Sequence, residues 1–343
     1  MGVQISEIVP KKEIDLDFLK NKILAVDTFN VLYQFLANIR QPDGTPLIDS
    51  KGRVTSHLSG LFYRTTNLIS KGIKLVYVFD GKPPELKYKT KEEREGRKRE
   101  AKEKYEKAKE EGKEDEMLKY AKQTAKLTEE MVEESKKLIK ALGLPCIQAP
   151  SEGEAQCAFL VKNNDAFAVA SQDYDSLLFG APRLIQNVTL AKKRHTASGI
   201  AVPIQPMLIE LDSLLNNLQI NIEQLICIGI LVGTDFNPQG IKGIGQKKAL
   251  ELVRKYKKPV LLFEALKKKY EIDFDWRDIF EIFKKPKVTR NYKIDFKEID
   301  ENKVKKILCD EHDFSEERVS NALTKVHESE EKRKQRELSE WFK

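Results

Sequence analysis

Two apolar runs that each end on an aspartate constrain the fold of this chain more than any other feature. Lys22–Asp27 and Lys74–Asp80 each place a short, continuous apolar stretch before the acid. Such runs are typical of buried parallel strands, and helical spacing of apolar residues over 30–39 and 57–70 supplies connecting helices. Because open parallel sheets bind ligands beyond the carboxyl ends of their strands, the repeated placement predicts a functional edge. We expect an α/β fold with a mixed, largely parallel central sheet flanked by helices.

A second acidic pattern lies between Ala149 and Asp175. The segment opens on Ala-Pro-Ser-Glu-Gly-Glu-Ala, contains the apolar run 166–170, and closes on Ser-Gln-Asp-Tyr-Asp. The segment carries four carboxylates. Glu152 and Glu154 lie at an expected helix start, and Asp173 and Asp175 lie just past an expected strand end. Ser151 with Glu154 also fits a capping box, and aspartates after a strand commonly make turns. The segment alone therefore leaves a metal site and ordinary local structure both open.

The charge balance permits a polyanionic partner without requiring one. The 343 residues include 61 Lys+Arg and 54 Asp+Glu, a net charge of +7, and 40% hydrophobic residues, enough for one or two domains. The Lys- and Glu-rich composition also suits a protein from a hot environment. The four cysteines lack the spacing of a zinc site and are interpreted as reduced intracellular thiols. No apolar run approaches the ~18 residues of a membrane span, so no membrane partner is expected.

The composition changes sharply between Lys87 and Lys109, where eleven basic residues stand against six glutamates. Helical sequence continues to about residue 116, and an amphipathic helix follows to Leu142. Most Lys/Glu helices are solvated faces with i,i+4 ion pairs, and that interpretation is open here. Since the insertion stands between strand-terminal acids, the alternative is a cationic helical arch over an acidic pocket, which would suit a phosphate backbone.

Closely spaced glycines precede a basic helix in the segment Gly240-Ile-Lys-Gly-Ile-Gly245-Gln-Lys-Lys-Ala. Such a loop lets backbone N–H groups approach a phosphate, while the helix N-terminus adds its dipole. A helix rather than a strand precedes the glycines, which argues against a dinucleotide-binding fingerprint. The pattern favours a helix–hairpin–helix grip on duplex DNA over a plain loop, through four residues: Gly243, Gly245, Lys247 and Lys248.

The remaining elements are expected from pattern alone. We expect short strands over 143–150, 177–179 and 183–185, followed by helices over 208–218 and 221–232. The pattern over 260–321 is helical, with breaks at Pro286 and near Asp310. The tail from 329 is highly charged and should be disordered in isolation. A one-turn helix near its end would place Leu338, Trp341 and Phe342 on one face for a partner's groove.

Taken together, these segments resemble the flap endonucleases of archaea and eukaryotes along nearly the whole chain. The resemblance rests on Tyr33-Gln-Phe-Leu, Tyr77-Val-Phe-Asp-Gly-Lys-Pro-Pro84, Ala149-Pro-Ser-Glu-Gly-Glu-Ala155, Gly243-Ile-Gly-Gln-Lys-Lys-Ala249 and the terminal Gln-x-x-Leu-x-x-Trp-Phe. Gln172 departs from an acid common in the family, and Gly153 replaces a more usual Ala, which could loosen its helix turn by up to ~1 kcal/mol. The chain ends one residue after Trp-Phe, without the basic extension of eukaryotic members, so an archaeal-type protein is expected.

The resemblance implies a structure-specific 5′ flap endonuclease with 5′–3′ exonuclease activity, acting in replication (Okazaki fragment maturation) and repair. It implies a metal-binding set of seven acids: Asp27, Asp80, Glu152, Glu154, Asp173, Asp175 and Asp235. Oxygen-only ligands favour two Mg²⁺ ions, with Mn²⁺ as a substitute, and two-metal hydrolysis of a phosphodiester. Within the set, Asp27 and Asp235 would act mainly through ordered waters, and the nearer ions would be held by the other five: Asp80, Glu152, Glu154, Asp173 and Asp175.

The resemblance also assigns roles outside the acid set. Lys87 and Arg94 would stabilise transition-state charge, and Tyr33 would stack on a base beside the cut. A K⁺ ion could bind at the glycine hairpin, and branched DNA with a 5′ flap is the implied substrate. The implied partner of the tail is a sliding clamp, contacted by four residues: Gln335, Leu338, Trp341 and Phe342. Apart from that complex, a monomer is expected.

The expected domain organisation is a single nuclease domain over 1–325 and a flexible tail over 326–343, with the clamp-binding motif at 335–342. Within the domain, the arch covers about 84–142, and the glycine hairpin with its following helix covers about 233–256. The location would be cytoplasmic and nucleoid-associated in an archaeon, or nuclear in a eukaryote. Two alternatives stay open: a bubble-cutting, junction-cutting or exonucleolytic relative, and a non-enzymatic DNA-junction or clamp adaptor.

Overall fold

The computed structural model describes residues 2–84, 86–111, 113–189, 193–195 and 201–341. Within them, a central sheet has the strand order β1-β9-β6-β5-β2-β3-β4. Its strands are β1 (Lys12–Glu13), β2 (Ile23–Asp27), β3 (Lys74–Phe79), β4 (Cys146–Gln148), β5 (Ala168–Ala170), β6 (Arg183–Gln186) and β9 (Met207–Glu210). Five neighbouring strands pair in parallel, in the order β6-β5-β2-β3-β4. Strand β9 then pairs antiparallel with β6, and the edge strand β1 pairs antiparallel with β9. The predicted mixed, largely parallel sheet is confirmed.

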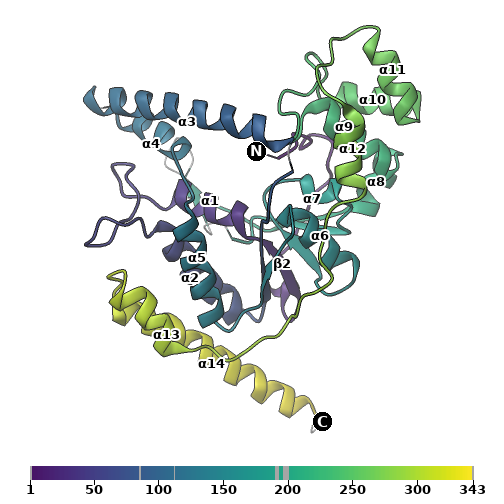
Figure 1. Ribbon diagram of the computed structural model, residues 1–343. Coiled ribbons are helices and arrows are strands. Elements are labelled where there is room, and N and C mark those ends of the chain that lie inside the picture. The colour runs from purple at the N-terminus through teal and green to yellow at the C-terminus, as the bar shows by residue number, and fades with distance from the viewer. Residues whose placement is uncertain (1, 85, 112, 190–192, 196–200, 342–343) are drawn as a thin grey trace.

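Helices cover both faces of this sheet because its central strands are apolar on both sides. On β2, Leu24 and Val26 pack into one hydrophobic cluster and Ala25 into the other, as the two-residue period of a strand requires. The first cluster includes α1 (Thr28–Asn38), α2 (Ser56–Ser70), α5 (Glu129–Ala141) and α14 (Glu316–Trp341). The second includes α6 (Gly153–Lys162), α7 (Asp175–Leu178), α8 (Leu211–Leu218) and α9 (Ile222–Val232). Figure 1 shows the two groups of helices on either side of β2.

A pair of helices, α3 (Lys87–Glu110) and α4 (Glu114–Gln123), projects from the body as the predicted arch (Figure 1, upper left). The two helices pack against each other, and three small side chains are buried in the pair: Ala101, Ala108 and Ala121. The following helix α5 instead packs on α2 and buries Leu138 and Ile139 in the main core. The projecting element is therefore shorter than the expected 84–142.

The glycine segment follows α9 and leads into α10 (Gln246–Tyr256), as the sequence predicts. Gly240 has a positive φ of 55°, and a Cβ there would lie 2.5 Å from the Leu231 carbonyl oxygen, so only glycine fits the turn. Gly243 also has a positive φ, of 83°, and faces open space. Gly245 is the N-cap of α10. The hairpin therefore leaves the start of α10 accessible.

The C-terminal third breaks near Pro286 and at Asp310 as expected, but the first break is longer than the sequence indicates. Short helices α11 (Pro259–Lys267) and α12 (Trp276–Lys284) are followed by an extended strap over 285–300. The strap is fixed by Thr289, whose backbone N–H donates to the buried Gln156 side chain. Then come α13 (Glu301–Lys305), a π-helical turn (Lys306–Asp310) and α14. Because α14 continues to Trp341, the expected boundary at 325/326 falls inside a helix rather than at the start of a flexible tail.

Two expected elements are wrong, and three strands were missed, namely the edge strand β1 and both strands of a hairpin. The segment 177–179 belongs to helix α7 rather than to a strand, and the first residues of the expected helix 208–218 form strand β9. Periodicity cannot separate helix from strand in apolar runs this short, and pairing with β6 and β1 decides the second case. A two-stranded hairpin of β7 (Lys193–His195) and β8 (Ala201–Pro203) was not anticipated.

In the described part of the chain, no single helix is both long and apolar enough to cross a membrane, although the bent pair α8 and α9 would pass on length and composition alone.

Candidate functional site

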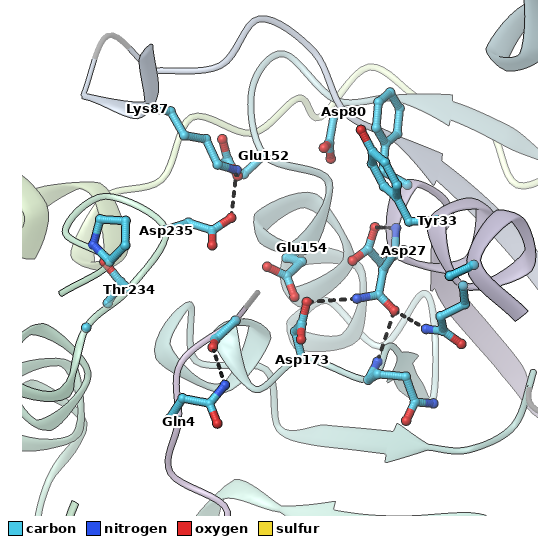
Figure 2. A pocket seen from close by; sticks show the side chains of 18 of the residues that line it. Gln4, Asp27, Tyr33, Asp80, Lys87, Glu152, Glu154, Asp173, Thr234 and Asp235 are labelled. Atoms are coloured by element: carbon cyan, nitrogen blue, oxygen red, sulfur yellow. Dashed lines mark hydrogen bonds and ion pairs between the residues drawn. The ribbon is translucent and has the colours of Figure 1, made fainter. Parts of the chain in front are cut away.

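A cavity of about 890 Å³ opens at the carboxyl edge of the sheet and gathers most of the predicted acids. Six of the seven line it: Asp27, Asp80, Glu152, Glu154, Asp173 and Asp235. Figure 2 shows their carboxylates facing the same space. The seventh, Asp175, is buried and does not line the cavity. The prediction that distant acids converge at the strand ends is therefore confirmed in the geometry.

Three of the acids also accept hydrogen bonds from backbone N–H groups. Asp27 is the last residue of β2 and the N-cap of α1. Asp80 follows β3 and accepts the backbone N–H of Gly153 at 2.7 Å. Asp175 begins α7 and accepts the backbone N–H of Val3 at 2.8 Å. Only Asp27 caps a helix, whereas Asp80 and Asp175 accept bonds from distant segments, and all three bonds fix the direction of their carboxylates.

The capping-box interpretation of Ser151 and Glu154 is wrong. The N-cap of α6 is Glu152, and no side-chain bond caps that helix. The Oε1 atom of Glu154 is buried without a hydrogen-bond partner in the protein. A buried, unpaired carboxylate oxygen is costly unless a cation or water completes it, so Glu154 favours a metal ligand over a structural cap.

The unusual glycine between the two glutamates has a spatial reason. A Cβ at Gly153 would collide with Oδ1 of Asp80, the atom that accepts the Gly153 N–H. The missing side chain therefore makes room for the Asp80 carboxylate close to the start of α6.

Lys87, the first residue of the arch helix α3, supplies positive charge to the cluster. Its Nζ lies 2.5 Å from Glu152 Oε2 and 3.4 Å from Asp235 Oδ2 (Figure 2). Burial alone would lower the pKa of Lys87, but the charges of Glu152, Asp235 and Asp80 outweigh it and raise the pKa. Lys87 is therefore held as the ammonium ion.

Four of the acids are buried and crowded enough for their pKa values to rise. Burial, helped by Glu152, raises the pKa of Asp80 to about 6. Burial, helped by Asp235 and Asp173, raises the pKa of Asp175 to about 8. Burial and neighbouring acids also raise the pKa values of Asp27 and Glu154 well above the ordinary range. Such shifts mark a site that needs further cations to ionise fully.

The donor chemistry of the cavity fits a hydrated divalent cation. Its acidic ligands are all oxygens, which hard cations prefer. Within the described residues, no three Asp, Glu, His or Cys side chains are close enough to hold one ion by themselves. Mg²⁺ keeps several waters and is completed by substrate phosphates, so it does not need a closed protein cage.

The other predicted site residues lie around this cavity or away from it. Tyr33, on α1, is 40% exposed and lines the cavity beside Asp27 (Figure 2). Arg94 lies in α3, but its side chain is outside the described part of the chain. Sequence reasoning missed Asn30, which donates to Asp173 at 2.8 Å. The only signal for it was its place one helical turn after Asp27.

The predicted DNA-binding and clamp-binding residues lie outside the cavity. Lys248 donates to the Gly243 carbonyl at 3.2 Å across the glycine hairpin, and Lys247 is well exposed at the start of α10. Gln335 is exposed on α14. The side chains of Leu338 and Trp341, and the whole of Phe342, lie outside the described residues.

Two family domains match this chain. Residues 1–101 match the XPG N-terminal domain and residues 143–235 match the XPG I-region. The matched ranges contain all seven acids, whereas most of the arch lies between them. The matched ranges therefore include the acid-lined cavity and the start of α3, but not the rest of the arch.

Archaeal relatives are similar over all or nearly all of the chain. Flap endonuclease 1 of Hyperthermus butylicus is 54% identical over 330 residues, covering 95% of this chain and 94% of that protein. Flap endonuclease 1 of Pyrococcus furiosus is 52% identical over 344 residues, covering 100% of both. Among solved structures, flap endonuclease-1 from Methanococcus jannaschii matches with a TM-score of 0.76 and 41% identity, covering 96% and 98% of the two chains.

More distant structures share the fold. The catalytic core of Rad2 in complex with a DNA substrate has a TM-score of 0.67 at 22% identity, covering 94% of this chain and 97% of that one.

Proposed function

This chain belongs to the flap endonuclease family, and from that premise we propose that its acid-lined cavity cuts DNA with two Mg²⁺ ions. The family activity is structure-specific hydrolysis of 5′ flaps, in replication and repair. The observation that carries the assignment to this cavity is the gathering of six acids and Lys87 around one space. Asp80, Glu152, Glu154 and Asp173 would hold the ions most directly.

Bound Mg²⁺ would supply an activated water and neutralise the phosphate and the acids. Lys87 would place its ammonium against the scissile phosphate, where negative charge builds up during displacement. Arg94, further along the same arch helix, would add to that charge. Tyr33 would stack its ring on a base beside the cut and so fix the strand over the acids. Asp27 and Asp235 would orient waters, and Asp175 would support the cluster from its buried position.

The DNA contacts outside the cavity follow from the same proposal. The accessible hairpin glycines and the N-terminus of α10 would grip duplex phosphates, with Lys247 and Lys248 adding charge and a K⁺ ion as an optional ligand. The arch would accept the single-stranded flap. The end of α14, from Gln335 onward, would dock in a groove of a sliding clamp. Outside that complex the protein would act as a monomer.

Single-turnover cleavage of a 5′-flap substrate with Mg²⁺ or EDTA tests the proposal. We expect cleavage only with the metal, and Glu154→Ala should abolish cleavage while flap binding in EDTA persists. Glu251→Ala, a surface acid on α10, is the matched control. Normal turnover by Glu154→Ala would remove the metal assignment. Faster cutting of bubble or nicked-junction substrates would point instead to a sibling activity, and metal-independent binding without cleavage would point to an adaptor.

A further inference from the structure

A closed circuit of hydrogen bonds ties together two acids that come from different strands. The backbone N–H of Asn30 donates to Asp27 Oδ1 at 3.2 Å, and its side-chain amide donates to Asp173 Oδ2 at 2.8 Å. The backbone N–H of Asp173 donates to Ser171 Oγ at 3.3 Å, and that hydroxyl donates to Asp27 Oδ2 at 3.3 Å. The circuit therefore joins the start of α1 to the turn that follows β5.

The orientation of the Asn30 amide is fixed by its other partners. Its oxygen accepts the backbone N–H of Gln172 at 3.3 Å and a second bond from the Gln34 side chain. A backbone N–H can only donate, so the amide oxygen must face Gln172 and the amide nitrogen must face Asp173. The dashed line that ends on Asp173 in Figure 2 is the hydrogen bond from the Asn30 amide nitrogen.

The turn that carries Asp173 is also held from its far side. The Gln186 side chain, at the end of β6, donates to the Gln172 carbonyl at 2.6 Å. With Asn30 on one side and Gln186 on the other, the turn has little freedom to rotate. The Asp173 carboxylate is thereby kept facing the cavity rather than solvent.

We propose that Asn30 is a positioning residue that sets the spacing of the Asp27 and Asp173 carboxylates for metal binding, with Ser171 closing the circuit. This inference rests on the proposed function. Asparagine suits the role because it supplies a donor to one carboxylate and an acceptor to the opposing backbone N–H. Aspartate at this position would offer only acceptors and a like charge beside Asp173. Partners that orient metal ligands typically change metal affinity or activity by about 10–100-fold when removed.

The test compares Asn30→Leu, which keeps most of the volume, with Asn30→Asp, which keeps the shape but loses the donor. Single-turnover cleavage is measured against Mg²⁺ concentration, and Mn²⁺ binding to the DNA-free protein is measured by calorimetry. Asn30→Leu should raise the half-saturating Mg²⁺ about 10–100-fold, with the rate largely rescued at high metal. Asn30→Asp should raise the half-saturating Mg²⁺ concentration further, and Ser171→Ala should raise it less. Flap binding in EDTA should be unchanged for all three variants. Asn67→Ala, a half-buried asparagine on α2, is the control for the chemical change.

The outcomes separate this inference from the proposed function. A lower melting temperature with unchanged metal affinity and unchanged Mg²⁺ dependence would mean that Asn30 has a structural role only, and would overturn the inference. A rate loss that no Mg²⁺ concentration rescues, with normal Mn²⁺ binding, would overturn it too. Glu154→Ala is assayed alongside: if that variant cleaves normally, the metal site itself is misassigned, whatever the Asn30 variants do.

Discussion

In the absence of divalent ions, the free energy of unfolding should fall as the pH rises from 6 to 8. Burial and the charges of Asp235 and Asp173 raise the pKa of Asp175 to about 8, and that of Asp80 is raised to about 6. In the unfolded chain both acids lose their protons near their ordinary pKa of about 4. Between pH 6 and 8 the folded state therefore retains a proton on Asp175 that the unfolded state has released, and raising the pH favours unfolding.

The size of the effect follows from one proton. Each proton retained only by the folded state lowers the free energy of unfolding by about 1.4 kcal/mol per pH unit. Over the interval from pH 6 to pH 8, Asp175 alone accounts for about 2 kcal/mol, because it is already half ionised in the folded state at pH 8. The raised pKa values of Asp27 and Glu154 steepen the fall. The effect is absent below about pH 4, where both states hold the proton, and complete once the pH exceeds the folded-state values.

Urea denaturation followed by circular dichroism, in EDTA at constant ionic strength, measures this slope. Saturating Mg²⁺ should flatten it because the ions stabilise the ionised acids. Asp175→Asn should also flatten it, since the amide oxygen still accepts the Val3 N–H but no longer titrates. Asp300→Asn is the control: Lys303 lowers the pKa of that surface acid, so its titration is finished before pH 6. Metal-free stability that stays constant or rises from pH 6 to pH 8 would refute the reasoning.

Four further predictions concern the reaction and its partners. Lys87→Met should slow single-turnover cleavage about 10²–10³-fold without weakening flap binding in EDTA, and an unchanged rate would exclude a role for the ammonium in the chemical step. Tyr33→Ala should lose about 1–3 kcal/mol of flap binding or positioning, measured by fluorescence anisotropy and single-turnover rates, and no loss in either would exclude stacking. Lys247→Ala should weaken duplex binding and reduce its salt dependence by about one phosphate contact; an unchanged salt slope would place the grip elsewhere. Deleting 335–343 should remove clamp stimulation and leave the basal rate intact, so a lost basal rate would give this segment another task.

The sequence predicted the acids best where they follow strands. Asp27 and Asp80 come directly after buried apolar runs, and parallel pairing then places them at one edge. Asp235 follows a helix, so only the family resemblance identified it. The convergence of these acids depends on strand order, which local pattern does not contain.

Other features depended on partners far away in the sequence. Residues 207–210 form a strand because β6 and β1 offer edges to pair with, which periodicity cannot show. The extended strap over 285–300 is fixed by contacts such as that of Thr289 with Gln156. Asn30 owes its importance to a turn more than 140 positions away, at Gln172 and Asp173. Tertiary contacts of this kind leave no mark in a single sequence.

Six of the seven acids lie at or beside a strand end or a helix start, and Asp235 follows the end of α9, whereas most of the arch and of the glycine hairpin lies outside that framework. Changing the arch beyond Arg94, or the hairpin beyond Asp235, would leave the reacting groups in place. Recognition of DNA shape and scission of the bond can therefore diversify independently: a new junction specificity requires refitting the periphery, while the chemistry is inherited unchanged from the scaffold.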